Sequence, residues 1–149
     1  MIVLDTNVIS ELMREQPDAN VKQWIKAQKT IHLAITAITV AEIQRGLTRL
    51  PEGKRRTQLT VNFSDFIAEA FSGRIFPFDE EAAYRYGEIA ATCESVGINT
   101  DAVDLMIAAI ASSRRAAIAT RNVKDFIGCG VAIINPWVNS SPQIPPDKQ

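Results

Sequence analysis

The sequence of 149 residues has little of what many enzyme classes depend on: two cysteines, one histidine and no long apolar segment. Cys93 and Cys129 are too few for a disulfide scaffold or a four-ligand zinc site, so we expect reduced thiols in a cytoplasmic protein. With His32 as the only histidine, activation of a nucleophile by histidine is not expected. The uncharged stretch 31–41 is too short to cross a bilayer, and Asp5 interrupts the first apolar run where a secretion signal would continue.

An excess of charge of one sign is also missing. The 16 Lys and Arg residues nearly balance the 17 Asp and Glu residues, giving a net charge of −1. A domain without a strong overall field is not drawn to nucleic acid or to anionic lipid by its net charge. Phosphate binding therefore has to come from a local patch or from metal ions. The sequence contains neither a Walker loop nor a complete dinucleotide-binding glycine motif, and it has no G-x-S-x-G nucleophile elbow.

Five short apolar runs alternate with helical patterns along the chain. The predicted strands are residues 2–4, 31–35, 75–78, 116–119 and 131–134, and the predicted helices are residues 8–14, 19–28, 40–50, 57–70, 80–96 and 103–113. Such short runs, apolar on both faces, are typical of buried parallel strands, although Pro77 restricts the third to a sheet edge. We predict one α/β domain over residues 1–138, with a central parallel sheet flanked by helices on both faces, and a proline-rich, disordered tail over residues 139–149.

Asp5 directly follows the first predicted strand. Ligands of open parallel sheets bind beyond the carboxyl ends of the strands, and Asp5 is placed there. The alternative role is to cap the next helix, but Thr6 and Asn7 are rival caps, so capping does not specifically require Asp5. We therefore favour a functional role.

Glu42 has two interpretations of equal weight. It lies three residues after Thr39, in the pattern of a capping box, where its side chain would only return a hydrogen bond to the Thr39 amide. Arg45 and Arg49 follow along the same helical stripe. They form either a solvated ion-pair face or a set of phosphate contacts beside a metal site.

Asp104 opens a helix that is apolar nearly all round. A cap is already available at Thr100 or Asp101, and a second acid that faces a buried region is costly unless a cation or a donor meets it. Asn122 and Asp125 follow the fourth predicted strand, where the alternative for both is a turn or helix cap. Gathered carboxylates repel one another, and a divalent cation with oxygen ligands, Mg²⁺ or Mn²⁺, removes that cost. Such a site suits hydrolysis of phosphodiesters.

The sequence contains four motifs in the order Asp5-Thr6-Asn7-Val8, Thr39-x-Ala41-Glu42, Asp104-x-x-Ile107-Ala108-Ala109 and Ala119-Thr120-Arg121-Asn122. Together, in this order, they resemble the PIN-domain family, and more narrowly the VapC-type toxins of bacterial toxin–antitoxin pairs. Residues 73–79 and the Asn135-Pro136-Trp137 ending are similar to the FitB-like branch. The resemblance covers residues 1 to about 138.

The resemblance implies a Mg²⁺- or Mn²⁺-dependent endoribonuclease that leaves 5′-phosphate and 3′-hydroxyl ends. Asp5, Glu42 and Asp104 would form the acidic core, with Asp5 and Asp104 on the metal and Glu42 on the metal or the attacking water. Many members have an acid where Asn122 stands, so Asn122 or Asp125 would complete the shell. Thr120 would orient a ligand or a phosphate.

The resemblance also implies a cognate antitoxin and a homodimer. We expect the antitoxin to dock on the helix after Glu42 and on an N-terminal helical pair that carries Ile9, Leu12, Met13 and Trp24, although these four also suit ordinary core packing. The run 54–56 is a further candidate for RNA contact, with a solvated turn as its plainer interpretation. Two alternative functions are a receiver-like signalling module, with Asp79 as phosphoacceptor, and a PIN domain that binds RNA without cutting it.

Overall fold

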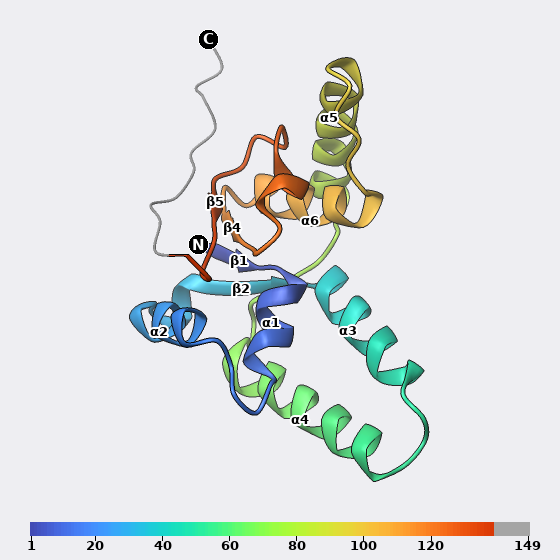
Figure 1. Cartoon of the computed structure of the whole chain (residues 1–149). Helices are drawn as coiled ribbons and strands as arrows, with labels where there is room; N and C mark the ends of the chain where they lie inside the picture. The colour runs from blue at the N-terminus through green and yellow to red at the C-terminus, as the bar shows by residue number, and fades with distance from the viewer. Residues whose placement is uncertain (139–149) are drawn as a thin grey trace.

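Five parallel strands form one sheet in the order β3-β2-β1-β4-β5 (Figure 1). The computed structural model describes residues 1–138, and the predicted tail at 139–149 lies outside the described residues. The strands are β1 (Ile2–Leu4), β2 (Leu33–Thr36), β3 (Ile75–Phe76), β4 (Ala117–Ala119) and β5 (Ile133–Ile134). The helices are α1 (Thr6–Leu12), α2 (Ala19–Ala27), α3 (Ala37–Arg49), α4 (Lys54–Ala70), α5 (Glu80–Ser95) and α6 (Ala102–Ser113), with short 3₁₀ turns η1 (Thr30–His32) and η2 (Val123–Phe126).

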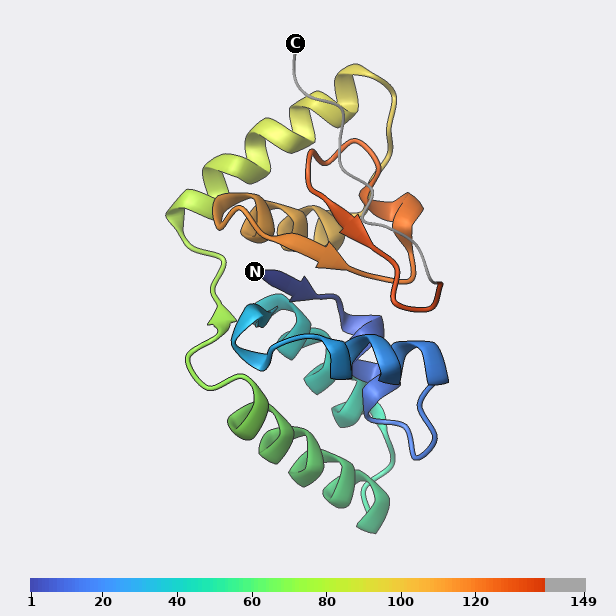
Figure 2. The same cartoon turned by 90° about the vertical axis from the view of Figure 1, so that its left-hand side faces the viewer.

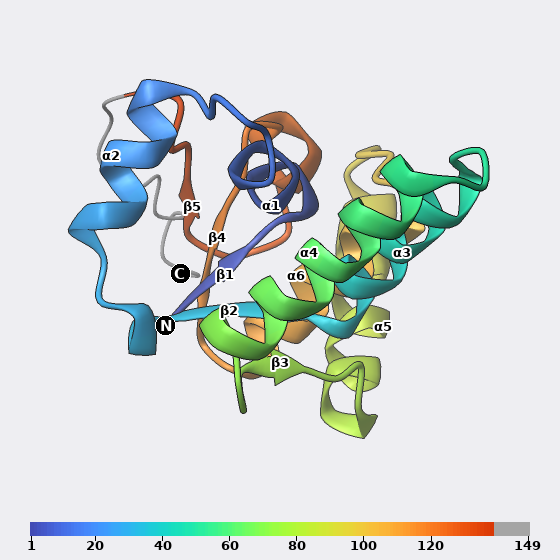
Figure 3. The same ribbon diagram turned by 90° about the horizontal axis from the view of Figure 1, so that it is seen from below.

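The sheet separates two hydrophobic cores, because successive strand residues point to opposite faces. In β1, Val3 packs with α5 and α6, whereas Leu4 packs with α1 to α4. Figure 2 shows these two groups of helices on the two sides of the sheet, and Figure 3, seen from below, shows α4 in front of α6. The predicted α/β architecture, with a parallel sheet covered on both faces, is confirmed. Among residues 1–138, no helix is long and apolar enough to span a lipid bilayer.

Several element boundaries differ from the prediction. The second strand begins at Leu33, since Ile31 and His32 belong to η1. The third strand has only two residues and lies at the sheet edge, as the proline at 77 requires. Helices α3 and α4 begin three residues earlier than predicted, so the run 54–56 forms the first turn of α4 rather than a loop.

Candidate active site

Asp5 is held in a fixed orientation where β1 ends. Its carboxylate accepts hydrogen bonds from Thr6 N (2.8 Å), Thr120 Oγ1 (2.8 Å) and Asn7 Nδ2 (3.1 Å), and the residue is only 4% exposed. Asp5 is also the N-cap of α1, so the rival caps Thr6 and Asn7 do not replace it. Burial raises the pKa of Asp5, an effect that the Thr120 hydrogen bond opposes and the charge of Glu42 increases.

Asn7 joins the end of β1 to the end of β4. Its Nδ2 donates to Thr120 Oγ1 (3.2 Å) as well as to Asp5, and its Oδ1 accepts from Arg121 N (3.1 Å). Thr120 is fully buried, and its hydroxyl oxygen also accepts from Asn122 N (3.1 Å). Thr120 therefore joins Asp5 to the loop after β4.

Glu42 does not form the capping box that its spacing suggests. The N-cap of α3 is Thr36, whose side chain accepts from Thr39 N, and Thr39 lies inside the helix. Glu42 Oε1 instead accepts a hydrogen bond of 2.6 Å from Thr6 Oγ1, which comes from α1. The exposed Glu42 side chain is thereby held beside Asp5.

Asp104 is half-buried in the first turn of α6, one turn after the N-cap Asp101. Its pKa is raised to about 7, first by burial and then by the charges of Asp5, Asp125, Asp101 and Glu42. Burial and four neighbouring carboxylates thus favour the protonated form of Asp104.

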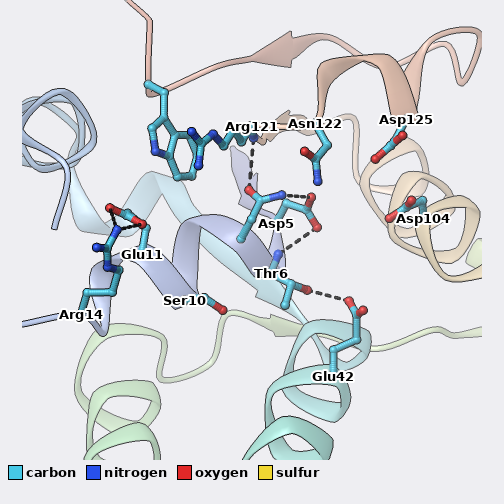
Figure 4. A pocket seen from close by; sticks show the side chains of 12 residues that line it. Asp5, Thr6, Ser10, Glu11, Arg14, Glu42, Asp104, Arg121, Asn122 and Asp125 are labelled. Carbon is cyan, nitrogen blue, oxygen red and sulfur yellow. Dashed lines mark hydrogen bonds and ion pairs between the residues drawn. The ribbon is translucent and has the colours of Figure 1, made fainter.

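One cavity of about 570 Å³ collects these side chains (Figure 4). Asp104 and Asp125 lie on one side of Asp5 in this view, and Glu42 extends toward Asp5 from α3. The predicted residues Asp5, Glu42, Asp104, Asn122 and Asp125 all line the cavity. Asn122 precedes η2 and caps it without a side-chain hydrogen bond, whereas Asp125 belongs to η2. These five residues are spread over sequence positions 5 to 125, and they meet at the carboxyl edge of the sheet, as predicted.

The cavity has the donor set of a site for a hard divalent cation. Carboxylate and amide oxygens line it, and both the burial and the carboxylate repulsion that raise the pKa of Asp104 are costs that such a cation relieves. Within residues 1–138, no three carboxylate, histidine or cysteine side chains converge closely enough to enclose a metal ion. The donor chemistry fits a hard divalent cation, and enclosing one requires the carboxylates to turn toward one another.

The arginines predicted to contact RNA lie outside this cavity. Arg45 and Arg49 are exposed on α3, and neither lines the cavity. Asp79 is also outside it: this residue is the N-cap of α5 and accepts from Ala82 N (2.9 Å). The structure therefore gives the receiver-like alternative no support, because its proposed phosphoacceptor is away from the other acids.

Seven residues that line the cavity were not predicted as site residues: Thr6, Asn7, Ser10, Glu11, Arg14, Arg121 and Trp137. Glu11 is buried and accepts from Asp18 N (2.8 Å) and from Arg14 Nη1 (3.1 Å to each oxygen), which lowers its pKa. Its position three residues after Val8, on the apolar stripe of α1, is a signal that it faces inward. Arg121 was part of a recognised motif, but nothing in its pattern indicated that it stacks on Trp137.

Known proteins with this sequence pattern point to one family. The pattern of the PIN domain matches residues 2–127. The chain is 43% identical to the VapC ribonuclease Y4jK of Sinorhizobium fredii, over 92% of this chain and 98% of that protein. It is 39% identical to the toxin FitB of Neisseria gonorrhoeae, over 92% of this chain and 99% of that protein.

A solved structure shares the fold as well. The crystal structure of FitAcB from Neisseria gonorrhoeae superposes with a TM-score of 0.87 at 39% identity, covering 92% of this chain and 99% of that one. Since the matched pattern spans most of the chain and includes Asp5, Glu42 and Asp104, the chain belongs to the PIN-domain family, on the branch that holds VapC and FitB.

Proposed function

We propose that this protein is a Mg²⁺-dependent endoribonuclease that acts as the toxin of a toxin–antitoxin pair. The observation that carries the proposal is the meeting of Asp5, Glu42 and Asp104 in one cavity at the carboxyl edge of the sheet. The names of its relatives, a VapC ribonuclease and the toxin FitB, support the same activity and role.

In this proposal each residue has a role that its contacts support. Asp5 and Asp104 hold the metal, and the three donors to Asp5 fix the direction of its remaining lone pairs. Glu42 binds the metal or positions the attacking water, and Asn122 or Asp125 completes the shell. A bound Mg²⁺ or Mn²⁺ would activate water and screen the scissile phosphate. Arg45 and Arg49, exposed on α3, remain predicted contacts to the RNA backbone, and the homodimer remains a prediction from the family.

Cleavage of RNA with Mg²⁺, with EDTA and with Zn²⁺ tests the activity. We expect cleavage with Mg²⁺ or Mn²⁺, none in EDTA, and no rescue by Zn²⁺. Asp104→Asn removes the charge but keeps the shape, so cleavage should fall by orders of magnitude while the fold survives. Glu42→Gln keeps the acceptor for Thr6 and should also inactivate without loss of stability.

Asp101→Asn is the matched control, because Asp101 lies one turn earlier at the same helix end and does not line the cavity. It should cleave RNA at nearly the normal rate. Full activity in excess chelator would refute the metal mechanism. RNA binding without cleavage under every metal condition would instead favour the non-cleaving alternative, to which the neutral Asn122 already points.

A groove between α1, α3 and α4 is the candidate docking site for the antitoxin. It has a volume of about 800 Å³ and is lined by the apolar residues Met13, Ile43, Leu47, Leu50 and Leu59. The groove shares Thr6, Ser10, Arg14 and Glu42 with the acidic cavity, so the two are continuous.

Most of the apolar residues predicted to contact the antitoxin do not line this groove. Of the four residues named from the sequence, only Met13 lines the groove: Ile9 is fully buried in the core, and Leu12 and Trp24 pack against that core. We infer that an apolar antitoxin segment occupies the groove and that a basic side chain from it reaches the carboxylates.

A charge placed in the groove tests this inference. A Cβ at Gly46 meets no atom within 4 Å, so Gly46→Arg fits the fold and even gains helix propensity. Co-expressed antitoxin should be retained at least tenfold less well. Gly87→Arg is the control, since Gly87 is an equally open glycine of α5 outside the groove. Equal retention by both variants would place the antitoxin elsewhere.

A further inference from the structure

Arg121 and Trp137 are brought together by two neighbouring strands. Arg121 is the second residue after β4, and Trp137 is the third after β5, so both leave the sheet at its carboxyl edge. The Arg121 Cζ atom lies 5.4 Å from the centroid of the Trp137 ring system, and both residues line the acidic cavity. A flat cation is therefore stacked on an aromatic ring beside the carboxylates.

Hydrogen bonds fix the backbone of both residues. Arg121 N donates to Asn7 Oδ1 (3.1 Å), and Asn7 also holds Asp5, so the arginine is tied to the acidic centre. Trp137 N donates to Asn135 Oδ1 (3.0 Å), and Trp137 O accepts from Asn20 Nδ2 (2.9 Å) of α2. The backbones of both residues are thus preorganised, which lowers the entropy that a ligand has to overcome on binding.

The charge of Arg121 is available to a ligand. Two arginines line the cavity, and Arg14 is already bound through both carboxylate oxygens of Glu11. Arg121 makes no ion pair with any carboxylate among residues 1–138, although several acids line the same cavity. Its side chain is exposed. Figure 4 shows Arg121 on the side of Asp5 away from Asp104 and Asp125.

We propose that Arg121, stacked on Trp137, binds the nucleotide next to the scissile phosphate. The N–H edge of the guanidinium donates to a phosphate oxygen, and its open face stacks on the base. This inference rests on the proposed ribonuclease function, for which it supplies a nucleotide subsite. An RNA strand fits better than a protein segment, because it offers both an anion and a flat ring to the same side chain.

RNA binding in EDTA tests the subsite without metal-dependent cleavage. The probes are a fluorescein-labelled 12-nucleotide RNA of mixed sequence and an abasic sugar–phosphate chain of the same length, both followed by anisotropy. Arg121→Gln should weaken RNA binding by about tenfold, the loss expected for one stacked base and one phosphate contact. Arg121→Lys should bind the abasic chain like the wild type but bind RNA several-fold more weakly, since lysine keeps the charge and lacks the flat face.

Lys124→Gln is the matched control, because Lys124 is an exposed cation of η2, three residues away and outside the cavity. It should stay within about twofold of the wild type, as expected for a surface charge. Unchanged RNA binding by Arg121→Gln overturns the proposal, and so does a wild type that binds no RNA. If Arg121→Lys binds both probes like the wild type, the positive charge alone accounts for binding, and stacking on the base is refuted.

Two further outcomes separate this subsite from other functions. Loss of co-expressed antitoxin by Arg121→Gln, with RNA binding intact, would assign the pair to a protein partner and overturn the proposal. RNA binding that depends on Arg121 in a chain that cleaves nothing with Mg²⁺ would support the subsite while refuting the nuclease.

Discussion

Asp5 and Asp104 line the same cavity but have very different surroundings. Asp5 receives three hydrogen bonds from side chains and backbone. Asp104 is half-buried near four other carboxylates, and its pKa is raised to about 7. The charge of Asp104 therefore opposes folding when no cation is present, which is the usual mark of a functional rather than a structural acid.

The first prediction follows from this raised pKa. Because the folded state binds the proton more tightly than the unfolded state, the stability of the metal-free protein should fall as the pH rises from about 4 to about 7 and then level off. Thermal unfolding in EDTA across this range measures the effect. Asp104→Asn should flatten the decline and melt higher than the wild type at pH 8. If Asp104→Asn has the same pH profile as the wild type, Asp104 does not cause the fall in stability.

Residue roles were predictable only where position in the fold decides them. Asp5 was predicted at the site because an acid that follows a buried parallel strand lies at the ligand-binding edge. The bond between Thr6 and Glu42 was not predictable, because it joins residues 36 positions apart and follows no local period. The Thr39–Glu42 pattern pointed to a capping box, yet Thr36 provides the cap one turn earlier.

At the scale of elements, periodicity predicted the existence of each helix better than its start. Helix α4 begins with Lys54, Arg55 and Arg56, although basic residues at a helix N-terminus oppose the helix dipole. Packing of Phe63 and Leu59 against the core outweighs this small cost, and no local pattern reveals that. The end of α5 was predictable, since Gly97, with a φ of +73°, follows the C-cap residue Val96.

Arg74 joins α4 to the sheet, and the second prediction concerns the stability that is lost when it is replaced. Its guanidinium donates to the carbonyl oxygens of Ala70, at the end of α4, and of Leu33, at the start of β2 (2.8 Å for the latter). Arg74→Met should lower the free energy of unfolding by about 2–3 kcal/mol, since hydrogen bonds from a charged donor are lost at a partly buried site. Chemical denaturation measures the change.

Arg85→Met is the control for Arg74. Arg85 is exposed on α5 and forms only a surface ion pair with Glu88 at 3.5 Å. Its replacement should change the stability by less than about 0.5 kcal/mol. Equal effects of the two substitutions would mean that Arg74 does not clamp the elements together.

At the scale of the whole molecule, strand order could not be predicted from the residues. Across the sheet the strands lie in the order β3-β2-β1-β4-β5, so β1 lies at the centre and pairs with both β2 and β4. That order places Asp5 in the middle of the edge, between the helix that bears Glu42 and the loop that bears Asn122. The sequence predicted which residues reach this edge, whereas their lateral arrangement depends on contacts between distant segments.

The last prediction concerns the two helical groups that the sheet separates. Asp104 comes from α6, which packs on one face, and Glu42 comes from α3, which packs mainly on the other. A cation bound between them links both groups and binds only the folded state, so Mg²⁺ should stabilise the protein by about 2.7 kcal/mol at one hundred times its Kd. Melting temperatures measured over a Mg²⁺ titration should rise by several degrees for the wild type and for Asp101→Asn, but much less for Asp104→Asn. A rise of equal size in Asp104→Asn would show that the stabilising ion binds elsewhere, and the acids of this cavity would then lose their assigned role.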